Sequence, residues 1–429
     1  MSAGEETGNS PIHRTIDAVW RMESAKIIAV LARIVGEIEL AEDLAQDALV
    51  IALERWPESG IPDKPGAWLM ATAKHRAIDR LRRDIRLEHK VVEMGRELEI
   101  QQAAQNEIEL PSAMEVEDDL LGLIFMTCHP ILSEEARVAL TLRLLGGLTT
   151  KEIARAFLIP EPTIAQRIVR AKRTLSEAHV PFDVPGEADR ALRLGSVLEV
   201  LYLIFNEGYA ATSGEEWVRP ALCEDALRMG RILAELVPGE PEVHGLVALM
   251  EIQASRLRAR VDVEGKPVLL RDQNRARWDR LLIGRGLSAL RRAQKLGGVM
   301  GPYTLQAAIA ACHAQALTPQ ETDWARIVAL YDALAQLAPS PVVELNRAVA
   351  ISIAYGAEAG LEIVEELVAG ESLKNYHLLP AVHGDLLSRL GRHEQACKEF
   401  ELAASLTGNA QERELLTGRA LAERQYLSG

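Results

Sequence analysis

The chain has few aromatic residues, few cysteines and no long hydrophobic run. Phe, Trp and Tyr together make up 4% of its 429 residues, and runs of β-branched and aromatic residues, which are typical of strands, are scarce. Alanine and leucine dominate instead, which favours an all-helical chain. Hydrophobic residues make up 48% of the sequence. This is enough for packed cores, so we predict a folded chain of about two to four domains.

The four cysteines are scattered, without the C-x-x-C spacing of a structural zinc site. This predicts a reducing, cytoplasmic environment and no bound metal. Two Cys-His pairs occur, Cys128-His129 and Cys312-His313, but adjacent helical residues point about 100° apart and chelate a metal poorly. No apolar run reaches the roughly 20 residues that span a bilayer, and the N-terminus lacks a signal-peptide core. We therefore expect no membrane partner.

Catalytic spacing is also missing: no stretch has the pattern of a catalytic triad, a phosphate-binding loop or a metal site. The sequence therefore predicts neither an enzyme nor a cofactor. The formal net charge of −14 argues against a free DNA-binding protein, but the charge is segregated. Residues 97–119 carry eight acidic residues and no Lys or Arg, whereas basic residues gather before residue 87 and again after residue 166. Such a chain binds DNA poorly unless a partner delivers it.

Residues 147–175 have the pattern of a helix-turn-helix. Thr149 and Glu152 have the spacing of a capping box and predict the start of the first helix. Pro160 and Pro162 separate that helix from a second one. The second helix has one apolar stripe and, on its other side, a cationic face that carries a Gln, as a reader of the major groove requires. The alternative is an ordinary solvated basic helix. The predicted stripe is Ile164, Ile168, Ala171 and Leu175.

The first 90 residues predict three helices. These span residues 11–35, 40–55 and 67–83, with Pro57 ending the second helix and a Pro/Gly-rich loop at residues 57–66. The second helix has acidic and amide side chains on its outward face. The third carries a polar stripe at helical spacing, which is either a phosphate-binding surface or a solvated face. The stripe is Thr72, His75, Arg76, Asp79, Arg80 and Arg83.

The last 250 residues are patterned as pairs of short helices. Residues 376–409 have small and aromatic residues at the positions of a 34-residue tetratricopeptide unit: Gly384, Ala396, Phe400 and Ala403. Such units stack into a solenoid with a concave binding surface, although a non-repetitive helical domain is the alternative. Polar-aromatic stretches at residues 206–209, 271–278, 301–306, 322–324 and 339–347 could form buried networks between helices or line a peptide or ligand groove.

Two parts of the sequence resemble bacterial RNA polymerase sigma factors. Residues 41–47, Trp68-Leu69 and residues 78–83 resemble region 2 of these proteins, and residues 120–175 resemble region 4. A region 2 joined by a linker to a region 4, without region 3, is the layout of the extracytoplasmic-function group. The C-terminal stretches resemble the subgroup with a tetratricopeptide-like extension. The resemblance implies a sigma factor that binds core RNA polymerase, through its clamp helices and flap, and directs promoter-specific initiation.

The resemblance also implies roles for three sets of residues. Those on the acidic helix would bind the polymerase: Asp43, Gln46 and Asp47. Those that would bind the −10 element are Asp63, Lys64, His75, Arg76, Arg80 and Arg83. Those that would bind the −35 element are Thr163, Gln166, Arg167, Arg170, Lys172 and Arg173. Delivery by the polymerase would explain how an acidic protein reaches promoter DNA.

These observations predict four segments. They are region 2 at residues 10–88, an acidic linker at 89–119, region 4 at 120–179, and a tetratricopeptide-like regulatory or interaction domain at 185–429. The last domain would regulate the sigma factor or contact a protein or ligand partner. The alternative function is a helical-repeat scaffold or adaptor that binds DNA through the helix-turn-helix and does not bind polymerase.

Overall fold

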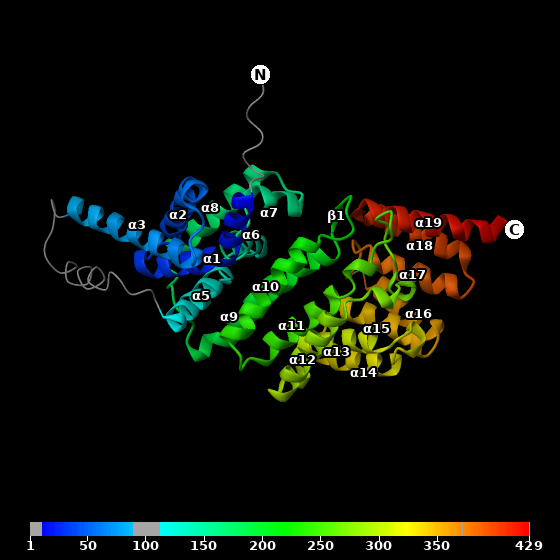
Figure 1. Cartoon of the computed structure of the whole chain (residues 1–429). Helices are drawn as coiled ribbons and strands as arrows, with labels where there is room; N and C mark the ends of the chain where they lie inside the picture. Colours follow the sequence, from blue (N-terminus) through cyan, green and yellow to red (C-terminus); the bar gives the residue numbers. More distant parts are fainter. Residues whose placement is uncertain (1–10, 89–111, 371, 429) are drawn as a thin grey trace, which may run out of the picture. The chain divides into compact units, whose positions relative to one another are not determined.

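The computed structural model describes residues 11–88, 112–370 and 372–428, which are almost entirely helical (Figure 1). In this part of the chain, the only strands are β1 (Ser213–Gly214) and β2 (Gly408–Asn409). The predicted all-α fold is confirmed. The chain divides into two compact units, Met1–Val200 and Leu201–Gly429, and the boundary falls inside α9 (Glu187–Tyr209).

The first unit begins with a bundle of three helices: α1 (Pro11–Val35), α2 (Ile38–Ser59) and α3 (Pro65–Glu88). The prediction that Pro57 ends the second helix is wrong, because α2 continues to Ser59. Pro57 lies in the last turn, so only its own missing N–H weakens the helix. The helix ends at Gly60, which has a positive φ of 83° and whose N–H donates to the carbonyl of Trp56.

Four further helices follow in the first unit. They are α5 (Ala113–Thr127), α6 (Glu134–Leu144), α7 (Thr150–Phe157) and α8 (Glu161–Glu177). Ser112 and Glu115 form a capping box at the start of α5, so residues 113–119 of the predicted acidic linker belong to a helix and Ser112 caps it. The remainder of that linker, residues 89–111, lies outside the described residues. Helix α5 ends at Thr127 and α6 begins at Glu134, so His129 lies between the two helices.

The helix-turn-helix forms as the sequence predicts. The Thr149 hydroxyl accepts from the N–H of Glu152, and the Glu152 carboxylate accepts from the N–H of Thr149 at 2.8 Å, so the capping box is complete. Leu158 ends α7 in the left-handed conformation, with a φ of 53°. Helix α8 buries the whole predicted apolar stripe, which packs against α6 and α7. In α7, Ile153 and Ala154 are buried and Phe157 is half-buried.

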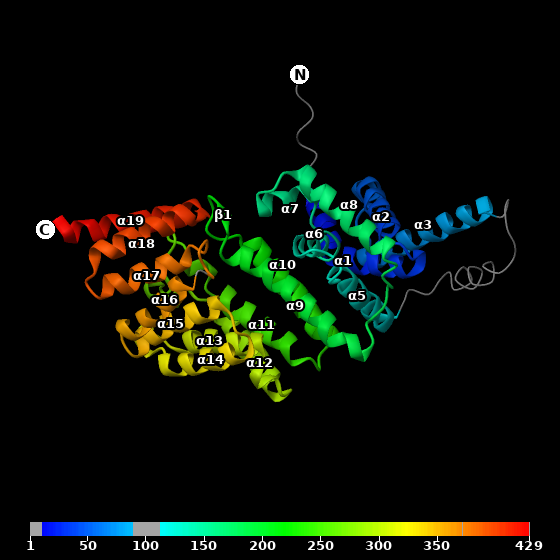
Figure 2. The same ribbon diagram turned by 180° about the vertical axis from the view of Figure 1, so that it is seen from behind.

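The second unit is a succession of α-helices joined mostly by short connections, with a longer segment at residues 255–279 that contains three short 3₁₀ helices (Figures 1 and 2). Several of these helices begin with a proline, which suits the first helical position because its missing N–H has no partner there. The α-helices are α10 (Pro220–Leu236), α11 (Pro241–Ala254), α12 (Arg280–Lys295), α13 (Pro302–Gln315), α14 (Trp324–Leu337), α15 (Pro341–Ala354), α16 (Ala357–Ala369), α17 (Leu378–Arg389), α18 (His393–Leu406) and α19 (Ala410–Ser428).

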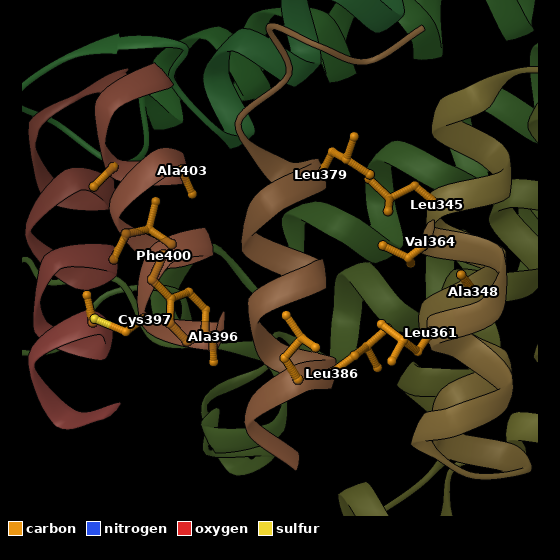
Figure 3. Close-up of a cluster of buried hydrophobic side chains, with 14 of the residues drawn as sticks. Leu345, Ala348, Leu361, Val364, Leu379, Leu386, Ala396, Cys397, Phe400 and Ala403 are labelled. Atoms are coloured by element: carbon orange, nitrogen blue, oxygen red, sulfur yellow. The ribbon is translucent and has the colours of Figure 1, made fainter. Parts of the chain in front are cut away.

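Helices α15 to α19 share one hydrophobic core (Figure 3). Phe400 of α18 is fully buried in it, with Leu386 of α17 and Leu361 of α16 in the same cluster. Gly384 of α17 lies against the ring of Phe400, and a Cβ at that position would come within 2.9 Å of it. Consecutive helices in this series pack against each other. The small and aromatic residues of the predicted repeat unit are thus packing partners.

The two short strands join distant parts of the second unit. Strand β1 pairs in parallel with β2, with Ser213 opposite Gly408. Asn409, which is fully buried, donates its side-chain amide to the carbonyls of Ala211 at 3.2 Å and Glu216 at 2.8 Å. The loop after α9 is therefore tied to the turn before α19.

Candidate nucleic-acid and partner interfaces

Helix α2 exposes the two predicted polymerase-binding carboxylates. Asp43 and Asp47 are exposed one turn apart, and Gln46 between them is half-buried. The backbone spacing places all three on one side of the helix. Partial burial raises the pKa of Asp43, and the nearby Glu42 carboxylate acts in the same direction while the Lys172 ammonium opposes it. Asp47 lies 3.6 Å from the guanidinium of Arg76 on α3, so one predicted polymerase contact is paired with one predicted DNA contact.

Glu42, beside this face, is the centre of an ionic cluster inside the first unit. Its side chain is 5% exposed and accepts from Nε of Arg143 at 2.6 Å and from the ammonium of Lys172. The side-chain amide of Gln46 donates to the same carboxylate at 2.8 Å. Buried carboxylates are stable when such charged donors satisfy them. Glu42 is a functional candidate that the sequence pattern alone does not single out, although it lies next to Asp43 and one turn before Gln46.

The predicted −10 residues lie on the α2–α3 loop and on α3. Asp63 and Lys64 are exposed in the loop, and His75, Arg80 and Arg83 are exposed along α3. Nε of Arg83 donates to the carbonyl of Asp79 at 3.2 Å. Arg76, paired with Asp47, is half-buried. The predicted stripe is therefore mainly a solvent-facing cationic surface that continues from the loop onto the helix.

A small hollow adjoins this loop. Its volume is about 300 Å³, and its lining includes Trp56, Trp68 and Pro62. The two indole rings meet edge to face, with centroids 5.4 Å apart, and Trp56 is buried while Trp68 is half-buried. The lining of the hollow also includes Glu54, Arg55 and Glu58, so the aromatic edge suits an unstacked nucleobase while the two carboxylates disfavour a phosphate there. The edge-to-face contact also makes Trp68 a packing partner of Trp56.

Helix α8 presents most of the predicted −35 residues to solvent. Thr163, Gln166, Arg170 and Arg173 are exposed, and Arg167 is half-buried at the edge of the same face. The opposite side is the buried apolar stripe. Helix α8 can therefore enter a major groove with a Gln and several guanidinium groups forward, an arrangement that supplies both base-edge donors and phosphate contacts.

Lys172 departs from this arrangement. Its side chain is 11% exposed and turns toward Glu42 instead of lying with the exposed arginines. The reason is its register, because Lys172 lies four residues after Ile168 and therefore near the buried side of α8. Its predicted phosphate contact is not available while it is paired with Glu42.

The polar-aromatic stretches of the second unit form buried networks. Arg275 donates to the carbonyls of His313 at 2.9 Å and Ala316 at 2.7 Å, which fixes the end of α13. Glu242 accepts from the N–H groups of Tyr303 and Thr304 at the start of the same helix. These contacts cap and connect helices, as one of the two sequence interpretations proposed.

The two Cys-His pairs also have structural surroundings. The thiol of Cys128 lies 3.4 Å from the Thr141 hydroxyl, and Nδ1 of His129 accepts from the N–H of Ile131. Burial lowers the pKa of His313 to about 3, and the guanidinium groups of Arg256 and Arg275 add to this effect. Among the described residues, no group of three or more His, Cys, Asp or Glu side chains could hold a metal ion. Within that part of the chain, no helix is long and apolar enough to cross a membrane.

Comparison with protein families identifies the two halves of the first unit. Residues 20–86 match sigma-70 region 2, and residues 123–175 match sigma-70 region 4. Residues 193–294 match a family of unknown function, DUF6596. The first match covers the acidic face of α2 and the cationic face of α3, and the second covers the helix-turn-helix. From here on, region 2 denotes α1–α3 and region 4 denotes α5–α8.

Three relatives extend this result. An uncharacterized protein of Rhizobium meliloti (strain 1021) is 42% identical over 400 residues, covering 92% of this chain and 93% of that protein. The RNA polymerase sigma-H factor of Pseudomonas aeruginosa is 28% identical over 176 residues, 39% of this chain and 88% of that one. The probable ECF RNA polymerase sigma factor SigI of Mycobacterium tuberculosis is 26% identical over 178 residues, 40% of this chain and 58% of that one. No solved structure matches the chain with statistical significance.

The chain therefore carries the sigma-70 region 2 and region 4 domains of a sigma factor, followed by a DUF6596 region. It belongs to the same family as the Rhizobium meliloti protein, which shares this length and is similar over nearly all of it.

Proposed function

We propose that this protein is a sigma factor of the extracytoplasmic-function type that binds core RNA polymerase and directs initiation at specific promoters. It acts by binding, without catalysing a covalent reaction. The observation that carries the proposal is the coexistence of three surfaces on sigma-70 regions 2 and 4. These are the acidic face of α2, the cationic face of α3 and the exposed face of α8.

Each surface has a distinct role in this proposal. Asp43, Gln46 and Asp47 bind the clamp helices of the polymerase, where exposed carboxylates suit a basic partner surface. The α2–α3 loop and α3 hold the −10 strand, with Asp63 and Lys64 in the loop and the hollow of Trp56 and Trp68 beside them. Helix α8 reads the −35 element, with Gln166 and Arg167 at base edges and the other cations on phosphates.

The second unit gives this sigma factor a regulatory or partner-binding extension. Its consecutive antiparallel helix pairs and the close contact of Gly384 with Phe400 support a tetratricopeptide-like solenoid. A protein or ligand partner of this unit fits the same proposal. We expect the extension to assist transcription. Deletion of residues 201–429 would then lower promoter-specific transcription, and an increase would show that the extension inhibits.

The test is in vitro transcription with purified core polymerase on a promoter library, together with a direct polymerase-binding assay. The decisive variant is the pair Asp43→Lys and Asp47→Lys. We expect polymerase binding to weaken at least about tenfold, because like charges at an interface are costly. The matched control is Glu362→Lys with Glu366→Lys, which makes the same charge change on exposed residues of α16. Wild-type protein that binds DNA but not polymerase would instead support the scaffold function.

A further inference from the structure

The cluster around Glu42 joins the two surfaces that the proposed function requires to be free. Glu42 lies next to Asp43 on the polymerase-binding helix, and its buried carboxylate is paired with Arg143 of α6 and Lys172 of α8. Lys172 belongs to the helix that reads the −35 element. One carboxylate of region 2 therefore holds two cations of region 4.

We propose that the Glu42 carboxylate clamps region 4 against α2 in the free protein, so that this contact must open before both regions engage polymerase and promoter DNA. The proposal rests on the proposed function and adds a closed, self-inhibited form to it. Two further ion pairs join the same regions. Nε of Arg33 on α1 lies 2.8 Å from the Asp119 carboxylate of α5, and the guanidinium of Arg21 lies 2.6 Å from Glu152 of α7.

The closed form uses side chains that the proposed bound form needs for DNA and polymerase. While the Lys172 ammonium neutralises Glu42, it cannot neutralise a DNA phosphate. Its charge also acts on Asp43 and offsets part of the negative potential that a basic polymerase surface would meet. Gln46 is engaged too, because its amide donates to Glu42 and not outward. When the contact at Glu42 opens, the side chains of Glu42, Lys172 and Gln46 are released together.

The ion pairs between region 2 and region 4 lie beside an unfilled space. A hollow of about 380 Å³ adjoins the ion pairs, lined by side chains of α1 and α2 and by the turn between α6 and α7. Gly147 and Thr149 of that turn border it, opposite Trp20 and Gln46. Helix α5 also packs against α1, so the part that opens is the contact of α6, α7 and α8 with α1 and α2, where the ion pairs border this hollow.

The test weakens the contact at Glu42 without altering a polymerase-binding or DNA-binding residue. Arg143→Gln removes one of the two cations on Glu42 and leaves Asp43, Asp47 and Lys172 in place. The matched control is Arg137→Gln on the same helix, whose guanidinium pairs with Glu199 and donates to Ser196, both on α9. Both variants are made in the full chain, labelled by energy-transfer dyes at Glu58→Cys and Glu177→Cys, since the four native cysteines are buried.

We expect Arg143→Gln to lower the energy transfer of the free protein and to raise its affinity for core polymerase at least about threefold, because the binding-competent population grows. Arg137→Gln should change neither. Unchanged energy transfer in Arg143→Gln would overturn the closed form, and lowered transfer without a gain in affinity would overturn the inhibition. Failure of the proposed function has a different signature, because wild type and both variants would then fail to bind polymerase at all.

A second surface, in the other unit, carries an independent inference. Helix α12 has five cationic residues, and the sequence contains no acidic residue between Arg280 and Met300. At 100° per residue, these five side chains fall within an arc of about 140°. All five are exposed, and none forms an ion pair among the described residues. They are Arg280, Arg285, Arg291, Arg292 and Lys295.

We infer that this face of α12 binds the phosphate backbone of double-stranded DNA. Gly284 and Ser288 lie at its centre, and a Cβ at Gly284 would meet nothing within 4 Å, so a phosphate backbone can approach closely. The cations extend over about 22 Å of helix, the length of several phosphate spacings. A groove of about 630 Å³ adjoins them, where the guanidinium of Arg231 is paired with the buried Glu251, so the free charge comes from the α12 cations alone.

The test measures binding of the full chain to a random-sequence DNA duplex over a range of salt concentrations, without polymerase. Changing Arg280, Arg285, Arg291 and Arg292 to Gln should flatten the plot of log affinity against log salt by about 0.9 for each lost phosphate contact. The control makes the same charge change at four exposed cations elsewhere in the unit: Arg326, Arg392, Lys398 and Arg424. Equal slopes for the two variants would overturn the DNA surface and point to an acidic protein partner. Because no polymerase is present, the result is independent of the proposed function.

Discussion

Glu42 of region 2 accepts a hydrogen bond from the ammonium of Lys172 in region 4, across 130 positions of sequence. The lysine is 11% exposed and the carboxylate 5%, so the pair is largely shielded from water and from screening by salt. The acidic helix and the reading helix are therefore not electrostatically independent in the free protein. A substitution on either helix is expected to change the behaviour of the other.

The reading helix should separate base recognition from phosphate attraction. We expect Arg167→Ala to cost about 1–3 kcal/mol at one promoter position and to relax specificity there, because a base-edge contact is lost. Arg173→Gln should weaken binding to all promoters alike and reduce the salt dependence by about one phosphate contact. Binding of polymerase holoenzyme to a panel of −35 variants distinguishes the two. Equal loss on every promoter in both variants would contradict a base contact by Arg167.

The capping box of α7 should matter for the local stability of region 4. Thr149→Ala removes the hydroxyl that accepts from the N–H of Glu152, and we expect a cost of about 1 kcal/mol. Hydrogen exchange of the α7 amides measures it. Ser176→Ala, at an exposed position near the end of α8, is the control and should leave exchange within about 0.5 kcal/mol of wild type.

Two glycines of the second unit should respond to alanine in opposite ways. At Gly384, the new methyl group would meet the buried ring of Phe400 at 2.9 Å, and we expect destabilisation of about 1–3 kcal/mol. At Gly418, an exposed position of α19 with open space around it, alanine should stabilise by about 0.5–1 kcal/mol through its better helix propensity. Urea denaturation followed by hydrogen exchange of α18 gives both values. A neutral Gly384→Ala would mean that α17 and α18 separate easily.

Acid should weaken the second unit through His313. Its pKa is about 3 in the folded protein against 6.5 in an unstructured chain, mainly because burial disfavours the imidazolium. The unfolded state therefore binds the extra proton between these two values. Stability from this residue is present above pH 6.5 and is lost as the pH falls toward 3, at a rate of up to about 1.4 kcal/mol per pH unit.

The check is the free energy of opening of α13 amides, measured by hydrogen exchange at pH 6.5 and pH 5. His313→Asn removes the titrating group, and we expect the difference between the two pH values to shrink by about 1.6 kcal/mol. Amides of α8, in the other unit, serve as the internal reference. An unchanged difference would show that acid acts on this unit through other residues.

Local signals in the sequence predicted the elements well. The Thr149–Glu152 spacing and the apolar stripe from Ile164 to Leu175 are decided by contacts within a few residues, so the helix-turn-helix could be predicted almost to the residue. The prediction that Pro57 ends the second helix was wrong because a proline in the last helical turn removes only one hydrogen bond, which that turn tolerates. The capping box of Ser112 and Glu115 was not predicted, because it lies in a segment whose acidic composition resembles that of a linker.

The tertiary partners of charged residues could not be predicted in the same way. Lys172 lies in a run of cations, and the run alone does not show that its ammonium meets Glu42. Such a contact depends on how separate helices pack, which one sequence does not encode in any short pattern. Likewise, the charge on Arg76 suggested DNA, whereas its position also places it beside Asp47.

The pairing of β1 with β2 limits how the second unit can be shortened or fused to another protein. In an open array of repeats, end repeats can be added or removed one at a time. Here Asn409 holds the carbonyls of Ala211 and Glu216, so removal of the last helices would strip hydrogen bonds from a loop near the start of the unit. The unit should therefore be kept or lost whole, and fusion boundaries belong outside it, beyond the end of α19.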